Sequence, residues 1–263
     1  MSLVENKTLR KMRAGELALG FGVHAMRGSL VPLLASAAGY DWLFIDMEHG
    51  ALSVDQACEV SVAALQHGIT PIVRVCSSAL HDGTRALDNG AMGVVVPHVD
   101  TVEEAKAVVK AYRYPPVGMR SWGGIVTQYG LRPPGPAEAQ AALNREIAVI
   151  AMIETPEAVE NVDAIAAGGG IHVLPIGSSD LSTTMGIPGQ FGHQRIQEAY
   201  KRVSAACKKH GRILGMGGIY DREWVKFYMG MGARFVLGGA DHGFLLAAAT
   251  ERAKFLRDVA QSV

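Results

Sequence analysis

The chain has 263 residues, of which 49% are hydrophobic and 19% charged, and its 25 basic and 25 acidic residues give a formal net charge of zero. This composition suits one large globular domain or two small ones, and the order of strands and helices described below predicts a single domain over residues 1–263. The composition gives no support for binding to nucleic acid or to an acidic membrane surface. Three widely separated cysteines, the absence of an apolar secretory core and the lack of a long apolar run predict a cytoplasmic protein without membrane spans.

Eight short apolar runs are distributed along the chain. They are nearly continuous instead of alternating with polar residues, which is typical of strands buried on both faces of a parallel sheet. The predicted strands are residues 17–23, 42–47, 71–75, 93–99, 148–154, 172–177, 213–218 and 235–240.

Helix signals separate these runs. Ser53 with Gln56, and Thr101 with Glu104, have the spacing of a capping box, and Thr155 precedes a proline at the first helical position. The predicted helices are residues 53–67, 101–112, 155–167, 193–210, 221–232 and 243–259.

Eight strand–helix units in one chain predict an α/β fold of the (β/α)8 barrel type. An open, doubly wound sheet is disfavoured because no GxGxxG sequence follows the first strand. The connection over residues 114–145 is rich in proline and glycine, so we expect it to be irregular and to serve a function or an interface.

Polar residues stand where the predicted strands end, and in such barrels the active site lies at the carboxyl ends of the strands. From the second strand onward these residues are Asp46, Glu48, His49, Arg74, His98, Glu154, Ser178, Ser179, Asp180, Asp241 and His242. This set predicts a site in which charged groups gather at one end of the barrel.

Glu154 and Asp180 end neighbouring strands and can converge on one cation. Oxygen ligands suit a hard divalent ion such as Mg or Mn, which keeps positions open for substrate and water. The alternative is a structural ion pair with lysine or arginine. We disfavour it because no basic residue adjoins either acid in the sequence.

Arg74 interrupts an apolar strand, where arginine is seldom buried without a partner. Its guanidinium is suited to a carbonyl or a carboxylate, or to a salt bridge with Asp46 or Glu48, and both remain open. His49 fits a general base, a metal ligand or a hydrogen-bonded core residue, and His98 and His242 are weaker candidates. No lysine lies in a predicted strand, which disfavours covalent imine chemistry.

Several segments in this order resemble the HpcH/HpaI family of metal-dependent (class II) 2-keto-acid aldolases. They are FIDMEHG, PIVRV, ALDNGAMGVVVPHVDTVEEAKAVVKAYRYPPVGMRS, AMIETPEAVENVDAI and IGSSDLSTTMG. The similarity covers roughly residues 15 to 260. Within the family, the chain resembles the 4-hydroxy-2-oxoheptanedioate and 2-dehydro-3-deoxyglucarate aldolases.

The resemblance implies a role for each matching residue. It makes Glu154 and Asp180 the ligands of Mg, Mn or Co, with no organic cofactor, and it puts Arg74 on the keto oxygen of pyruvate. It pairs His49 with Asp88 of a neighbouring subunit for proton transfer. It also implies a homohexamer, a trimer of dimers, whose last helix packs across the dimer. The pyruvate carboxylate is implied at the backbone of Ser178, Ser179 and Asp180, with Asp46 and Met152 close behind the site.

The sequence departs from the family pattern at substrate-facing positions. Met152 replaces a common glutamine, GSSD at residues 177–180 replaces GPAD, and Trp122 is added in GMRSWGG as a possible contact of the acceptor aldehyde. The implied reaction is reversible cleavage of a 4-hydroxy-2-keto acid to pyruvate, or a related keto acid, and an aldehyde through a metal-stabilised enolate. Two alternatives are a bond-forming synthase using the same enolate and a barrel that binds keto acids without turnover.

Overall fold

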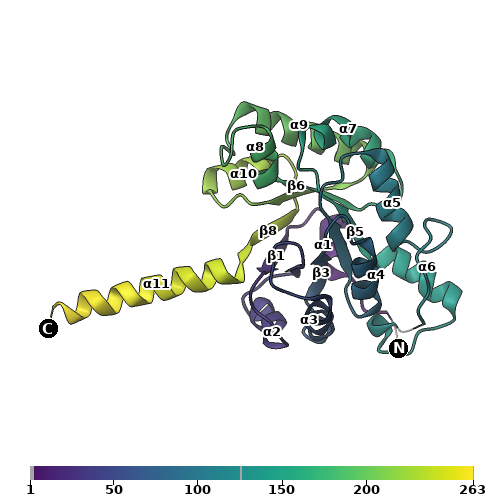
Figure 1. Ribbon diagram of the computed structural model, residues 1–263, viewed down its shortest axis with the longest axis horizontal. Coiled ribbons are helices and arrows are strands. Elements are labelled where there is room, and N and C mark those ends of the chain that lie inside the picture. The colour runs from purple at the N-terminus through teal and green to yellow at the C-terminus, as the bar shows by residue number, and fades with distance from the viewer. Residues whose placement is uncertain (1–2, 125, 263) are drawn as a thin grey trace.

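A computed structural model, described here for residues 3–124 and 126–262, shows eight parallel strands closed into one barrel in the order β1 to β8 (Figure 1). The strands are β1 (Ala18–Val23), β2 (Trp42–Asp46), β3 (Thr70–Arg74), β4 (Gly93–Val96), β5 (Ala148–Ala151), β6 (Val173–Gly177), β7 (Ile213–Gly217) and β8 (Phe235–Ala240). The barrel confirms the predicted fold. Strands β4 and β5 end three residues earlier than predicted, so the polar ends of these runs lie in loops above the sheet.

Eleven α-helices lie along the described residues, and most of them follow a strand and surround the barrel. They are α1 (Lys7–Arg13), α2 (Leu30–Ala37), α3 (Val54–Gln66), α4 (Leu80–Asp88), α5 (Val102–Tyr112), α6 (Pro136–Glu146), α7 (Pro156–Ala167), α8 (Ser178–Thr184), α9 (Gln194–His210), α10 (Arg222–Gly230) and α11 (Asp241–Ala260), with a 3-10 turn η1 (Thr127–Tyr129). The capping boxes at Ser53 and Thr101 are both formed, which confirms these two predicted helix starts. Every lysine lies on a helix, as predicted.

The connection over residues 114–145 is only partly irregular, which corrects the prediction. Its second part forms α6, which begins with Pro136 at the first helical position and continues through the helix-forming sequence AEAQAALNRE. The proline and glycine signal is therefore confined to the segment before α6.

The barrel interior is filled by large side chains near the amino ends of the strands. The ring of Trp42 stacks on Phe235 with centroids 3.9 Å apart, and Gly20 lies so close to Trp42 that any side chain there would collide with the indole. Leu9 and Met12 of α1 join the same cluster and close this end of the barrel. The opposite, carboxyl end is left for polar groups.

The last helix leaves the barrel. In Figure 1, α11 extends away from the rest of the chain instead of packing over β8 and β1. Its large apolar residues are exposed, including Leu245 at 66% and Leu246 at 68%. Within the described part of the chain, no helix has both the length and the apolar character needed to cross a membrane.

Candidate active site

The strongest polar contact at the carboxyl end of the barrel joins β2 to β3. Asp46 and Arg74 are partners in the register of these strands, and both side chains are buried. Arg74 donates from Nε to Asp46 Oδ1 at 2.9 Å and from Nη2 to Oδ2 at 2.6 Å, a bidentate pair. Burial alone would raise the pKa of Asp46, but the hydrogen bonds and charge of Arg74 outweigh it and hold that pKa below its usual value.

Glu48 completes the hold on the arginine. Its Oε2 lies 3.1 Å from Arg74 Nη1, and its side chain is only 14% exposed. The sequence left the partner of Arg74 open, and the structure shows both acids in contact with it. Glu48 is thus a partner of Arg74, one of the two options that the sequence left open.

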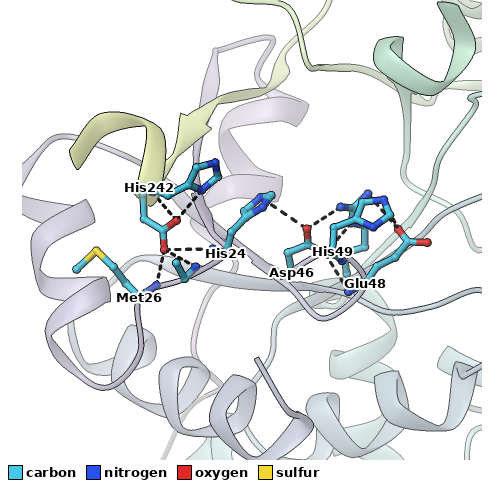
Figure 2. A network of polar contacts seen from close by, with 9 residues as sticks. His24, Met26, Asp46, Glu48, His49 and His242 are labelled. Atoms are coloured by element: carbon cyan, nitrogen blue, oxygen red, sulfur yellow. Dashed lines mark hydrogen bonds and ion pairs between the residues drawn. The ribbon is translucent and has the colours of Figure 1, made fainter. Parts of the chain in front are cut away.

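His49 is turned outward from this ion pair. Asp46 Oδ1 accepts the backbone N–H groups of Glu48 and His49, which fixes the turn that follows β2. The imidazole of His49 is 64% exposed, and its Nε2 lies 4.0 Å from Glu48 Oε2 (Figure 2). The structure therefore places His49 at the mouth of the site, where its ring is accessible to a substrate or to another chain.

His24, at the end of β1, belongs to the same network, although the strand ends considered in the sequence began with the second strand. Its Nε2 lies 3.6 Å from Asp46 Oδ2 and is buried without a hydrogen-bond partner among the described residues (Figure 2). Burial lowers the pKa of His24, although the nearby carboxylates of Asp46 and Asp241 oppose the shift. The signal was present, because His24 directly follows the first apolar run.

Asp241 has a structural task at the start of α11. Its Oδ2 accepts the backbone N–H groups of residues 24–26, the closest being that of Met26 at 2.6 Å, and its Oδ1 accepts that of His242 (Figure 2). It therefore joins the β1 loop to the end of β8. The exposed ring of His242 lies 5.4 Å from that of His24, measured between centroids.

Glu154 is buried just beyond β5, with only 1% of the residue exposed. Its Oε1 accepts the backbone N–H of His98 at 2.7 Å, and His98 Nδ1 lies 3.4 Å away from the same oxygen. The second oxygen, Oε2, has no hydrogen-bond partner among the described residues. Burial raises the pKa of Glu154, and the charge of Asp180 adds to this effect. A buried carboxylate with a free oxygen is unfavourable unless a cation or proton satisfies it.

Asp180 lies near Glu154, as the third residue of α8, and is partly exposed. Neither acid pairs with a lysine or arginine within 4.0 Å in the described residues, so the structural ion pair considered above is absent there. Gly177 makes room for the pair, because a side chain at that position would collide with Glu154 Oε2. No group of three or more histidine, cysteine or acidic side chains is placed to hold a metal among the residues described. Two carboxylates nevertheless fit Mg, which usually keeps several waters.

The remaining predicted residues of this region have different surroundings. The hydroxyl of Ser178 lies 2.8 Å from that of the buried Tyr200, so the side chain faces the outer layer of the barrel. Ser179 is exposed in the first turn of α8, where backbone N–H groups lack partners inside the helix. Met152 is half-buried against the interior cluster and beside Gly177.

Asp88 and Trp122 do not join the site within one chain. Helices of a β/α barrel run back toward the start of the next strand, so Asp88, the last residue of α4, lies at the opposite end of the barrel. Its carboxylate pairs with Arg120 Nη2 at 2.6 Å. Trp122 follows α5 in the same way and packs edge-on against Tyr114. Either residue can reach an active site only in another subunit.

Comparisons of sequence and of structure with known proteins identify the same protein family. The sequence matches the HpcH/HpaI aldolase/citrate lyase family over residues 32–248. It is 39% identical over 252 residues to a 4-hydroxy-4-methyl-2-oxoglutarate aldolase of Chaetomium globosum, covering 94% of this chain and 93% of the relative.

Two solved structures extend the likeness to three dimensions. An HpcH/HpaI aldolase from Desulfitobacterium hafniense superposes with a TM-score of 0.86 at 28% identity, covering 94% of this chain and 95% of that one. The citrate synthase SbnG superposes with a TM-score of 0.83 at 29% identity, covering 95% and 98%.

Proposed function

The chain belongs to the HpcH/HpaI aldolase/citrate lyase family and is an enzyme of the aldolase type, and we propose that it cleaves a 4-hydroxy-2-keto acid reversibly to pyruvate, or a related 2-keto acid, and an aldehyde. The observation that carries the proposal is the carboxyl end of the barrel itself. There a buried carboxylate, Glu154, has a free oxygen and lies close enough to the carboxylate of Asp180 and to the guanidinium of Arg74 for both charges to act on it. Asp46 holds this guanidinium in place.

Glu154 and Asp180 would hold a divalent cation. The fit rests on the free Oε2 of Glu154, on the nearness of the Asp180 charge, and on the space left by Gly177. When bound, Mg, Mn or Co would supply positive charge that stabilises the negative charge developing on the keto oxygen during carbon–carbon cleavage.

Arg74 would provide the second positive contact to that oxygen. Two acids and the face of Phe44, whose ring centroid lies 5.0 Å from the guanidinium carbon, fix its position before substrate arrives. A donor that is already oriented costs no rearrangement when charge develops in the transition state. In this proposal Asp46 holds Arg74 without touching the substrate.

His49 would move the proton of the C4 hydroxyl. In the cleavage direction a base removes this proton, and the C3–C4 bond then breaks to release the aldehyde. The imidazole of His49 is exposed at the mouth, and the only acid near it in its own chain within the described residues is Glu48, 4.0 Å away and already paired with Arg74. Asp88 of a neighbouring subunit would orient the ring, since the Asp88 of the same chain lies at the other end of the barrel.

The keto-acid carboxylate would accept hydrogen bonds from the backbone N–H groups of Ser179 and Asp180. These groups lie in the first turn of α8, next to the proposed metal ligands. Trp122 would contact the aldehyde substituent from a neighbouring subunit, because its own loop is remote from its own site.

The projecting α11 supports an oligomer. The helix leaves the outer face of the barrel uncovered, and exposed apolar residues flank the gap, such as Leu30 and Leu33 on α2 and Phe227 on α10. Exposed apolar surfaces of this kind mark interfaces in soluble proteins. We propose that α11 packs across a dimer and that dimers assemble into a hexamer.

The test measures both products. Chelator-treated protein is supplied with Mg, Mn or Co and a series of 4-hydroxy-2-keto acids, and pyruvate and aldehyde are quantified. We expect activity to return with a divalent ion and to be lost in E154Q and D180N without loss of folding. Metal-independent turnover, or wild-type kinetics of either variant, would overturn the ligand assignment.

The likeness to a citrate synthase leaves one other candidate reaction, in which a keto-acid unit is joined to a second carbonyl compound. Condensation without measurable aldehyde release from any 4-hydroxy-2-keto acid would favour it. Binding of pyruvate in a calorimeter with no turnover at all would favour a non-catalytic barrel instead.

A further inference from the structure

Arg120 is an unusual side chain at the end of the barrel remote from the site. Only 2% of the side chain is exposed, whereas its partner Asp88 keeps 28% of its side chain accessible. The guanidinium carbon lies 4.8 Å from the centroid of the Tyr114 ring, and the Nη2–Oδ1 distance to Asp88 is 2.6 Å. A buried guanidinium thus holds a carboxylate that faces outward.

The hydrogen bond between Arg120 and Asp88 uses only one nitrogen of the guanidinium and one oxygen of the carboxylate. The Nε and Nη1 atoms of Arg120 are buried and have no hydrogen-bond partner among the described residues. Asp88 Oδ2 accepts no hydrogen bond in the same part of the chain, and a Cβ atom at Gly123 would lie 3.4 Å from it, in ordinary van der Waals contact. A buried charge that leaves two donors unused is a poor device for stability alone. It is well suited to fixing the direction of the free carboxylate oxygen.

We propose that Arg120 is a positioning residue that presents Asp88 to His49 of a neighbouring subunit. This inference rests on the proposed function, in which Asp88 serves a neighbouring site. With Oδ1 held by Arg120, Oδ2 is left to accept the imidazole N–H of that histidine, which fixes the orientation of the ring. Each active site would then depend on an arginine that touches neither substrate nor the reacting atoms.

Single variants measure the size of the effect. We expect R120M to lower kcat about 10- to 100-fold with little change in KM, the usual scale for groups that orient a catalytic residue. R120K keeps a charge and one donor and should retain more activity than R120M. R85M is the matched control, because Arg85 lies on α4, the helix that carries Asp88, and makes an exposed 3.4 Å contact with Asp82. It should behave as wild type.

Mixed oligomers test whether the effect passes through Asp88 of another chain. H49Q and R120M chains are co-expressed with different affinity tags, and mixed oligomers are purified by both tags. A site is complete where an R120M chain supplies His49 and a neighbouring H49Q chain supplies Asp88 and Arg120. If Arg120 acts in trans, random mixing should restore about a quarter of wild-type activity. R120M mixed with D88N should restore none, because both defects lie in the chain that donates the aspartate.

The outcomes separate the inference from the proposed function. H49Q mixed with D88N is the reference pair, and its failure to regain activity would overturn the trans role of Asp88 and the inference with it. Success of that pair together with failure of H49Q and R120M would overturn the role of Arg120 alone. Size-exclusion and melting profiles of each variant, R120K included, show whether lost activity reflects lost assembly.

Discussion

Two buried arginines at opposite ends of the barrel differ in what surrounds them. Arg74, at the carboxyl end, is paired with the carboxylates of Asp46 and Glu48. Arg113, which follows α5 at the other end, donates to the backbone oxygens of Gly170, Asn144 and Ile147, the last at 2.9 Å. Both are almost fully buried, so burial does not distinguish them.

The difference lies in charge. Burial lowers the pKa of Arg113 to about 9, because neutral carbonyls and other arginines surround it. The pKa of Arg74 is raised, since the hydrogen bonds and charge of Asp46 outweigh burial, with a further contribution from Glu48. Arg113, which donates only to neutral groups, connects loops of the fold. Arg74 is oriented by two carboxylates and lies near the free carboxylate oxygen of Glu154, where a ligand can bind. Variants at the two ends should therefore fail in different ways.

The largest effect is expected for R74K. Lysine keeps the positive charge beside Asp46 but lacks the rigid fork that holds the second donor in place. We expect kcat/KM to fall about 100- to 1,000-fold, the scale for removing one donor to a developing oxyanion. Steady-state kinetics give the loss, and a thermal melt close to wild type would show that the fold is intact. Unchanged kcat/KM would remove Arg74 from the reaction.

G177A should follow, through the metal site. The added methyl would collide with Oε2 of Glu154 and displace the proposed ligand, so we expect metal affinity and activity to fall about 10- to 100-fold. G217A is the control, since Gly217 is its register partner on β7 and has open space for a methyl, the nearest atom being 3.9 Å away. Metal titration followed by activity compares the two, and equal behaviour would contradict the role of the Gly177 space.

The barrel and most of the charged residues of the site could be predicted from the sequence because both depend on local order. Continuous apolar runs identify strands, and a polar residue near the end of such a run must emerge at the carboxyl end of the barrel, as Arg74 and Glu154 do. His24 also directly follows an apolar run. Asp241 follows one as well, but its carboxylate accepts backbone N–H groups of the loop after β1 instead of facing the site, which its position in the sequence does not indicate.

Contacts between distant segments were beyond the sequence. The sequence offered Asp46 or Glu48 as a partner of Arg74 but did not show that both acids hold it at once. The resemblance gave Asp88 a role without revealing the buried Arg120 that holds it. The helix α6 was hidden because proline and glycine dominate the residues before it. These features depend on which loops meet in three dimensions, which spacing along the chain does not encode.

R113M should sharpen the contrast by damaging stability instead of chemistry. Loss of the guanidinium removes its donors from the buried carbonyl of Ile147 and from the partly buried carbonyls of Gly170 and Asn144. We expect the free energy of unfolding to fall by about 3 kcal/mol, roughly 1 kcal/mol for each of these groups. Urea unfolding measures this. The activity per folded molecule should stay near wild type, as it should in R202M, whose arginine makes an exposed contact to one carbonyl.

The smallest effect concerns the histidine beside Arg113. Arg113 Nη2 lies 2.8 Å from Nδ1 of His172, and burial, together with the charge of Arg113, lowers the pKa of His172 from 6.5 to about 3. Between pH 6.5 and about pH 3, His172 is therefore protonated in the unfolded chain and neutral in the folded chain. The stabilisation is complete above pH 6.5 and is lost progressively as the pH falls toward 3. Wild type should lose about 1 kcal/mol of unfolding free energy per pH unit from this group alone.

In H172N the slope of unfolding free energy against pH, between about pH 6 and pH 4, should be smaller by that amount. H81N, at an exposed histidine, should leave the slope unchanged. An equal slope in H172N would mean that His172 binds the same number of protons in both states, and that burial and the charge of Arg113 do not lower its pKa on folding.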